Sequence, residues 1–450
     1  MINSKRLTLT GAMIISIGLL TACNDDNETT VSIPDTNLPE DVEGCFWGGP
    51  YSIDNPESNF AYPDTGATYW HAKYSLPEGS SLKLNGDFPY ARYMSFNSYK
   101  QDASPAFALT DRDIIAENGA VNPFVQGAQR NSDKRGYQIK LAAGEAPIIP
   151  PNNILYDYTE GNSESLLLYR VYVPNKGKDA TGGVGLPTPE LTLSSGEVLT
   201  GQAVCDTLKS DQELIKIPVV PEQTYANLRQ NNPAKQNPVW RAVYNIQFSL
   251  RCGFLGQCDG NPVRQVPWFA NLDNQYIASF IDRDIKPIAV IRGKIPKVPS
   301  TVDGNEVFDE SGTQVRYWSM CQNEYYSQKV TGCLYDEQVK INPDGYYTIA
   351  TSLPSDKPNN VTEECGIGYL PWSAQGDGFS IIPGRQDNKS DGLLIMRNML
   401  PAANFEQAIQ NTSVPGDEAA VLGEFLPNVE YFTKAEFEAL GCDAYKSLPQ

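Results

Sequence analysis

Four arginines occupy strand-like stretches that recur in pairs along the 450-residue chain. Arg92 in ARYMSFN has its counterpart Arg316 in VRYWSMC, and Arg170 in LLLYRVYVP has its counterpart Arg397 in LLIMRNMLP. Successive side chains of a strand point to opposite faces, so each arginine shares a largely apolar face. A guanidinium in such a place needs a carboxylate or several carbonyls, because removing the partner of a buried charge costs about 3–5 kcal/mol.

Carboxylates recur at similar distances from these arginines. Asp111 follows Arg92 by 19 residues and Asp336 follows Arg316 by 20, and an F-A-x-x-D motif opens each repeat. One interpretation is a polar pocket in each repeat, where arginine holds an anionic or polyhydroxyl ligand. The alternative is an internal Arg–Asp pair in each repeat that fixes strand register. The ligand-binding candidates are Arg92, Asp111, Arg170, Arg316, Asp336, Arg397, Asp64 and Asp273.

The order of these landmarks indicates an internal duplication. Arg170 follows Arg92 by 78 residues and Arg397 follows Arg316 by 81, although the second repeat needs insertions such as VPSTVDGNEVFDESG. The 36 Gly and 33 Pro are typical of many turns between short strands. We therefore predict a mainly β fold of two tandem antiparallel, jelly-roll-like sandwich units. The alternative is that short strands in any β protein resemble one another.

Short helices are expected outside the repeats. One would start at Pro221 in the connector, and two would follow the capping-box spacings Asn404/Gln407 and Thr433/Glu436, the second ending at Gly441. The expected parts are a signal peptide (1–22), a lipidated tether (23–44), a first β unit (45–205), a connector (206–268), a second β unit (269–403) and a C-terminal helical extension (404–450).

The N-terminus has the pattern of an exported lipoprotein. Lys5 and Arg6 precede a short apolar run that ends in Leu20-Thr21-Ala22-Cys23, too short for a membrane span. The ending resembles a bacterial lipobox, which implies diacylglycerol on Cys23. Asn24 stands where an aspartate would signal retention in the inner membrane, so we expect the outer membrane. The alternative is an uncleaved membrane anchor with a chance cysteine.

The eight other cysteines are an even number in an exported chain, which indicates disulfides. Eight cysteines allow 105 pairings. Proximity favours Cys252–Cys258 and Cys321–Cys333, which leaves Cys45 with Cys205 and Cys365 with Cys442 as a guess. With no C-x-x-C and a single His, we expect no metal and no cofactor.

Charge and motifs limit the classes of activity. A net charge of −19 disfavours nucleic-acid binding. A Ser-His-Asp triad would have to use His71, which strand alternation places on an exposed face. No G-x-S-x-G is present. A glycosidase that uses two carboxylates stays open, since it needs only two acids at a suitable separation. Residues 387–392 could bind calcium, but Lys389 favours a hairpin turn.

The second repeat carries R-Y-W-S, D-G-x-Y-T-I, N-N with L-P-W, and L-L-x-x-R-x-x-x-P in that order. This series resembles a bacterial domain family of unknown function, and the whole chain resembles uncharacterised secreted proteins with ARYMSFN and CLYDEQV segments. The first repeat has Met94 in place of the tryptophan and lacks L-P-W. The resemblance implies a β-sandwich and transfers no activity.

Taken together, these patterns predict a lipoprotein anchored to the outer membrane through Cys23. It would bind a ligand or partner, such as an anionic or carbohydrate ligand, through its β-sandwich units. The alternative is a hydrolase of extracellular polysaccharide or ester polymers that uses acidic residues beside the repeated arginines.

Overall fold

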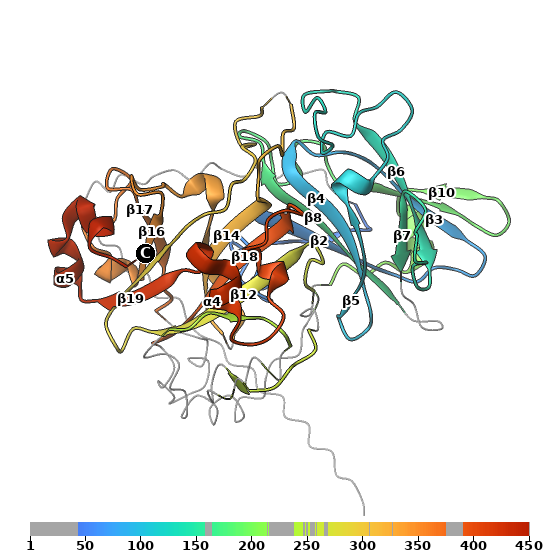
Figure 1. Cartoon of the computed structure of the whole chain (residues 1–450). Helices are drawn as coiled ribbons and strands as arrows, with labels where there is room; N and C mark the ends of the chain where they lie inside the picture. Colours follow the sequence, from blue (N-terminus) through green and yellow to red (C-terminus); the bar gives the residue numbers. More distant parts are fainter. Residues whose placement is uncertain are drawn as a thin grey trace, which may run out of the picture. The chain divides into compact units, whose positions relative to one another are not determined.

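The strands expected around the four arginines form in the computed structural model of the chain (Figure 1). The structure describes residues 44–157, 164–213, 215, 238–245, 248, 251–252, 257, 259–264, 269–305, 307–325, 327–374 and 390–449. Several expectations fall outside these residues: the signal peptide, lipidation at Cys23, nearly all of the tether, the helix from Pro221, Cys258, and residues 387–389 of the proposed turn.

Ten strands lie in the described residues of the first unit. They are β1 (Gly48–Tyr51), β2 (Ala67–Tyr74), β3 (Ser81–Asp87), β4 (Ala91–Tyr99), β5 (Pro105–Thr110), β6 (Gly136–Ala143), β7 (Ile154–Asp157), β8 (Ser165–Pro174), β9 (Thr188–Thr192) and β10 (Val198–Thr200). One sheet has the order β1-β2-β8-β4-β5 and the other β10-β9-β3-β6-β7. Helix α1 (Gln202–Leu208) follows and buries Val204 and Leu208.

The second unit has nine strands within the part of it that the structure describes. They are β11 (Arg241–Ala242), β12 (Asn274–Asp282), β13 (Ile288–Gly293), β14 (Val315–Asn323), β15 (Val330–Tyr335), β16 (Tyr347–Ser352), β17 (Ile367–Pro371), β18 (Asp391–Pro401) and β19 (Asn428–Phe432). One sheet has the order β11-β12-β18-β14-β15 and the other β17-β16-β13-β19.

The two units share one topology. The order β2-β8-β4-β5 of the first unit matches β12-β18-β14-β15 of the second, and β9-β3-β6-β7 matches β19-β13-β16-β17. The expected duplication and two-sandwich fold are confirmed. The sheets are not purely antiparallel, however. The β6–β7 and β16–β17 pairs are parallel, a difference that hydrophobic alternation alone does not reveal.

Alternation along the central strands builds a separate core in each unit. In β4, Met94 and Phe96 point between the two sheets of the first unit and join one apolar cluster. In β14, Trp318 and Met320 do the same in the second unit. The opposite faces of β4 and β14 are buried as well, since all nine residues of each strand are buried. Both faces of these strands therefore have partners.

The C-terminal region completes the second sandwich. Strand β19 pairs with β13, and Phe437 of α5 (Lys434–Ala439) packs in a cluster with Ile288 and Val290. Thr433 caps α5 in the expected capping box with Glu436. No helix starts at Asn404. The helical segments after β18 are η5 (Ile409–Asn411), α4 (Glu418–Leu422), η6 (Gly423–Phe425), α5 and η7 (Gly441–Lys446).

Three disulfides join the pairs expected from the sequence: Cys45–Cys205, Cys321–Cys333 and Cys365–Cys442. Cys252 is also disulfide-bonded. These bonds indicate an oxidising, extracytoplasmic compartment. Within the described residues, no helix has the length and apolar character that crossing a membrane requires.

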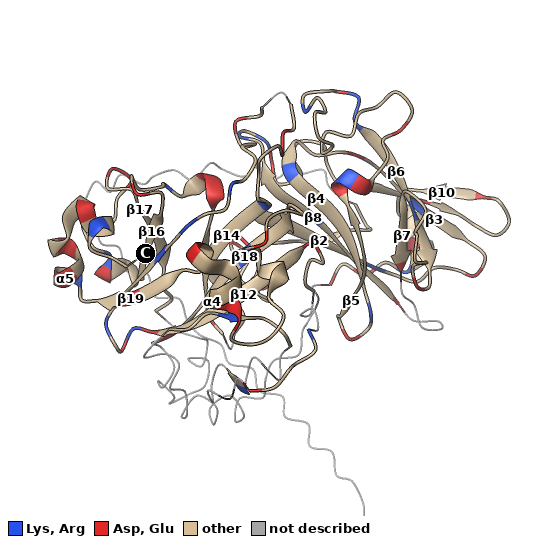
Figure 2. Cartoon of the chain, viewed as in Figure 1, with Lys and Arg blue, Asp and Glu red and all other residues tan. Residues whose placement is uncertain are grey.

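Most charged residues lie in loops, turns and short helices, while the strands are largely uncharged (Figure 2). The four repeated arginines are exceptions, because each lies in the central part of a sheet or at the end of a central strand. Their surroundings define the candidate site.

Candidate functional site

The candidate residues meet where the two units contact each other, within one compact body of residues 40–450. Residues on the outward face of the β2-β8-β4 sheet contact residues of the second unit. Tyr172 of β8 packs edge-on against Tyr317 of β14, with ring centroids 5.2 Å apart. Tyr93, Val173 and Met399 belong to the same buried cluster. We call this contact region the inter-unit interface.

Each strand-opening arginine pairs with the aspartate of the other unit. Arg92 Nη1 lies 2.5 Å from Asp336 Oδ1, and Arg316 Nη1 lies 2.7 Å from Asp111 Oδ1. The side chains of all four residues are at most 1% exposed. The sequence suggested pairs inside each unit. The structure instead pairs each arginine with the aspartate of the opposite unit.

Turns hold the two aspartates in equivalent places. Asp111 and Asp336 are the first residues of the 3₁₀ turns η1 (Asp111–Asp113) and η2 (Asp336–Gln338), which follow β5 and β15. Each accepts a backbone N–H from its own unit, at 3.0 Å, from Met94 and Trp318 respectively. Each carboxylate is thus bound to its own central strand on one side and to the other unit on the other.

Burial and pairing act in opposite directions on these groups. Burial raises the pKa of Asp111 to about 6, and the Arg316 guanidinium and the Met94 amide oppose a larger rise. Burial likewise raises the pKa of Asp336, against the effect of Arg92. Burial lowers the pKa of Arg316, but Asp111 and then Glu310 outweigh it, so the net change is upward. With a pKa of about 6, Asp111 is therefore mostly ionised at pH 7.

The insertion before Arg316 covers both ion pairs. Its Glu310 accepts from Arg316 Nε at 2.6 Å and from Nη2 at 2.9 Å. Its Thr301 Oγ1 accepts from Arg92 Nε at 2.9 Å. Glu337, next to Asp336, pairs with Arg92 and accepts the Thr301 N–H. Sequence reasoning treated this stretch as a gap in the repeat, so it missed Glu310 and Thr301.

Asp64 of the first F-A-x-x-D motif also reaches into the second unit. It accepts Tyr317 Oη–H at 2.8 Å and Ser319 Oγ–H at 2.6 Å, while the Gly66 N–H bonds it locally at 2.9 Å. Arg397 Nη1 lies 3.6 Å away. Asp64 is buried, and its side-chain partners all belong to the second unit.

Asp273 of the second motif makes the reciprocal contact with the first unit. Its Oδ2 accepts Tyr93 Oη–H and Thr110 Oγ1–H, both at 2.6 Å. Tyr93 stands in β4 where Tyr317 stands in β14. The exchange therefore includes the aspartates and tyrosines as well as the arginines.

The second pair of arginines contacts the F-A-x-x-D segment of the opposite unit. Arg170 donates to the Phe269 carbonyl at 2.6 Å and, within its own unit, to Asn97 Oδ1 and Tyr99 Oη at 2.5 Å. Arg397 donates to the Tyr62 carbonyl at 2.7 Å. Both guanidiniums are buried, and burial lowers their pKa, but neighbouring groups more than compensate and the pKa of each rises.

Three further arginines among the described residues are buried and were not singled out from the sequence: Arg130, Arg135 and Arg292. Arg130 donates to the carbonyls of Ala91 (3.1 Å) and Thr301 (3.2 Å) and to Asn175 Oδ1 (2.7 Å), so it also spans the two units. Burial, followed by Arg92 and Arg135, lowers its pKa to about 10. Its loop, QGAQRNSDKRG, has the composition of an exposed turn, so no sequence signal indicated burial.

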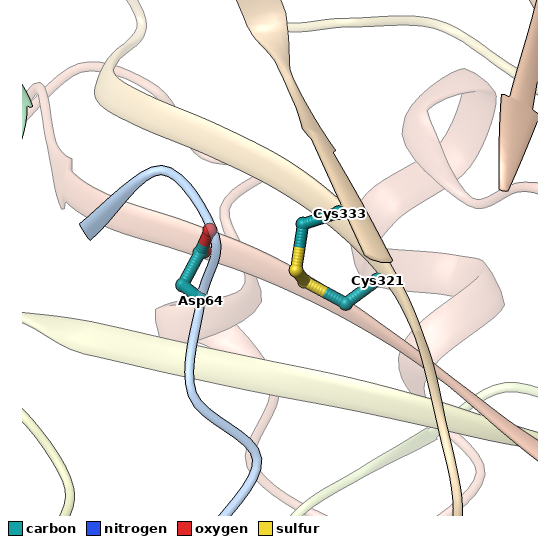
Figure 3. A group of neighbouring side chains, drawn as sticks. All are labelled: Asp64, Cys321 and Cys333. Atoms are coloured by element: carbon teal, nitrogen blue, oxygen red, sulfur yellow. A yellow bond between two sulfur atoms is a disulfide. The ribbon is translucent and has the colours of Figure 1, made fainter. Parts of the chain in front are cut away.

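Three potential metal ligands lie together at Asp64, Cys321 and Cys333, with ligand atoms within 4.8 Å of one another. Figure 3 shows the two sulfurs joined as a disulfide beside the carboxylate. Cys321 and Cys333 face each other directly across β14 and β15. Metals bind the thiolate, so these bonded sulfurs are not a ligand set in this state. Arg397 Nη1 instead lies 2.7 Å from Cys321 Sγ.

The prediction that His71 is exposed was wrong. Strand β1 covers it, with Gly48 directly opposite, and its side chain is fully buried. Its Nδ1 lies 2.8 Å from Tyr51 Oη, which accepts the Ile215 N–H at 3.0 Å. Burial lowers the pKa of His71 to about 4, so the ring is neutral at pH 7.

The site and the fold define a two-unit β-sandwich protein in which the repeated charges join the units. No protein-family model matches the sequence, and no curated protein matches it. Among solved structures, the chain is similar to an uncharacterised protein from Burkholderia cenocepacia, with 12% identity, a TM-score of 0.44, and coverage of 88% of this chain and 83% of that chain. It is also similar to a protein from Vibrio parahaemolyticus, with 14% identity, a TM-score of 0.37, and coverage of 83% and 90%.

Proposed function

We propose that the chain is a lipoprotein anchored to the outer membrane through Cys23, which binds a ligand or partner through its β-sandwich units and does not catalyse a reaction. The observation that carries the non-catalytic part is that seven of the eight repeated charges are buried and that the eighth, Asp273, is half-buried. Each of the eight candidates is hydrogen-bonded or ion-paired at the inter-unit interface. A glycosidase needs acids that can reach substrate. These acids instead stabilise the contact between the two units. Their role therefore supports a non-catalytic protein whose ligand binds at another surface.

The anchor part of the proposal is supported by the N-terminal sequence and the disulfides. Leu20-Thr21-Ala22-Cys23 has the lipobox pattern, and the disulfides fit an exported protein. The R-Y-W-S to L-L-x-x-R-x-x-x-P series supports placing the units in the uncharacterised bacterial β-sandwich family that they resemble. Membership of this family would imply a β-sandwich fold for each unit but no particular substrate.

The test of the anchor is the mass of the mature N-terminal peptide after growth with an alkyne-tagged fatty acid. We expect an acylated peptide that begins at Cys23, in outer-membrane fractions. Asn24→Asp should move the protein to the inner membrane without changing its acylation. A mature chain without an acyl group would overturn the anchor.

The test of binding against catalysis uses residues 40–450, which form a compact unit. Acidic and neutral oligosaccharides are screened by thermal shift, and we expect at least one of them to raise the unfolding temperature. A ligand at 100 times its Kd stabilises the folded protein by about 2.7 kcal/mol. The same samples are assayed for chain cleavage and for hydrolysis of ester polymers. If the wild type cleaved a substrate and Asp273→Asn did not, the protein would be a hydrolase instead.

A further inference from the structure

The loop that joins β6 to β7 carries the two most exposed large apolar side chains of the described residues. Ile148 is 102% exposed and Ile149 is 86% exposed. They form the tip of GEAPIIPPNN, residues 144–153. Ile115, 55% exposed, belongs to the segment that borders the base of this loop. Exposed apolar residues that adjoin one another indicate an interaction site more strongly than scattered ones.

The base of the loop is fixed on the sandwich. The Gly144 N–H donates to the Asp157 carbonyl at 2.9 Å, and the Lys140 N–H donates to the Asn153 carbonyl at 2.8 Å. The Asn153 side chain bonds both backbone groups of Ile115, at 2.7 Å and 2.8 Å, and the Gln138 carbonyl at 2.9 Å. The tip therefore projects from an ordered base, so little conformational freedom would be lost when it is buried.

The chemistry of the tip fits a lipid environment. Pro147, Pro150 and Pro151 have no backbone N–H, so the loop has fewer donors that would lose water on entering an apolar phase. The loop contains no Lys or Arg, and Glu145 is its only charged residue. Attraction to anionic lipids is therefore not the driving force, and apolar burial is.

We propose that the Ile148–Ile149 tip inserts into the surface of the bilayer to which the chain is anchored. The inference rests on the proposed lipid anchor. The 20 residues between Cys23 and Gly44 span at most about 70 Å. A tether of this length keeps the body at an effective concentration near the bilayer on the order of millimolar, so weak insertion is sufficient.

The small size of the tip favours a bilayer over a protein as its occupant. A stable protein interface buries about 800 Å² on each partner and involves about 20–30 residues a side. Two isoleucines and a neighbouring third are far fewer than that. Insertion into lipid needs no complementary surface and engages only the apolar tip.

The first experiment measures where the tip lies in the anchored protein. The full acylated chain, labelled with an environment-sensitive fluorophore at Ile149→Cys, is reconstituted in phosphatidylcholine vesicles. A matched chain carries the label at Ile341→Cys, a position 49% exposed in the second unit. We expect nitroxide on the lipids to quench the label at 149, and aqueous iodide to quench the label at 341. Equal access of iodide to both labels would overturn the proposal.

The second experiment separates this inference from the anchor itself. The mature chain without an acyl group, residues 24–450, is sedimented with the same vesicles at lipid concentrations on the order of millimolar, which match the effective concentration that the tether provides. Ile148→Ser/Ile149→Ser should lower its vesicle partitioning at least tenfold, whereas Ile341→Ser should leave it unchanged, and 0.5 M salt should have no effect. Equal partitioning of the double variant and the wild type would refute insertion.

The mass of the N-terminal peptide is read on the anchored sample. If the N-terminal peptide is acylated and iodide reaches the label at residue 149, only the insertion is refuted. A peptide without acyl, together with tip-dependent partitioning of the free chain, refutes only the anchor. A photocrosslinker at 149 that captures one discrete protein in intact envelopes, and no lipid, assigns the tip to a protein partner and overturns the bilayer.

Discussion

The two units keep the same arginines but surround them differently. In the second unit, Arg316 is held by two carboxylates, Asp111 from the opposite unit and Glu310 from the insertion. In the first unit, Arg92 also has two carboxylates, but both come from the opposite unit. Arg170 has only neutral acceptors among its direct hydrogen bonds, whereas Arg397 lies 3.6 Å from the Asp64 carboxylate.

This difference indicates which contacts the duplicated architecture requires. The exchanged pair of an arginine with the opposite aspartate is present twice, with the same backbone N–H on each aspartate. The other contacts of Arg92 and Arg316 differ between the units, and residues of the second unit make most of them. A reciprocal contact of this kind has the form of an isologous dimer interface, here made within one chain.

The largest expected effect comes from the exchanged aspartates. Asp111→Asn leaves the buried Arg316 without its inter-unit carboxylate, so we expect a loss of about 3–5 kcal/mol in the free energy of unfolding, measured by denaturant titration. Asp336→Asn should cost a similar amount through Arg92. Equal losses would show that the two halves of the exchange are equivalent.

Asp113 is the matched control, because it lies two residues from Asp111 in the same turn and is exposed. Asp113→Asn should change stability by less than about 0.5 kcal/mol. If Asp111→Asn were as mild as this control, the exchanged pair would not join the units.

Much of this architecture could be predicted from the sequence, because strand alternation and spacing are local. The ARYMSF and VRYWSM repeats predicted the central strands, and the spacing to Asp111 and Asp336 singled out the two acids, although not the turns that hold them. The exchange was not predictable. Alternation gives the strand face that Arg92 shares with Met94, but it does not say which part of the chain lies next to the end of that strand.

The same limit explains the error at His71. Its face of β2 looked polar because Lys73 follows, yet β1 covers it through contacts that are distant in sequence. Glu310 and Arg130 were missed for a related reason, because both lie in loops. Loop residues show no periodicity, so their partners appear only in three dimensions.

Substitutions of Arg397 and Arg170 test whether the different surroundings of these two arginines contribute differently to the free energy of unfolding. Arg397→Met removes the cation nearest the buried Asp64, so we expect a loss of about 3–5 kcal/mol in the free energy of unfolding. Arg170→Met leaves only neutral acceptors unpaired, which should cost about 1–3 kcal/mol. Denaturant titration of both variants gives the comparison, and a larger loss for Arg170→Met would reverse it.

His71 should give the first unit a contribution to the pH dependence of stability that the second unit lacks, because Ala278 occupies the equivalent place in β12. Its pKa in the folded protein is about 4, below the unfolded value of 6.5. As pH falls from 6.5 towards 4, the unfolded chain takes up a proton and the folded chain does not. Stability due to this group is therefore lost on acidification, by about 3 kcal/mol at pH 4.

The measurement is the free energy of unfolding between pH 4 and 7.5, for the wild type and for His71→Gln, which keeps an acceptor for Tyr51. Buried carboxyls such as Asp111 contribute equally to both chains, so the difference between the two curves isolates the histidine. We expect the curves to converge as pH falls. Parallel curves would mean that His71 does not titrate in this range.

Glu310 should give the smallest effect, because it supplements a pair that is already complete. Its side chain is 24% exposed, while Asp111 is fully buried. Glu310→Gln should cost about 1–2 kcal/mol in denaturant titrations. In 1 M salt, where the screening length is about 3 Å, that cost should fall, and the cost of Asp111→Asn should persist. If the loss of stability in Glu310→Gln did not change with salt, Glu310 would behave like Asp111, as a buried partner of Arg316. The two units would then differ in sequence around their arginines but not in energy.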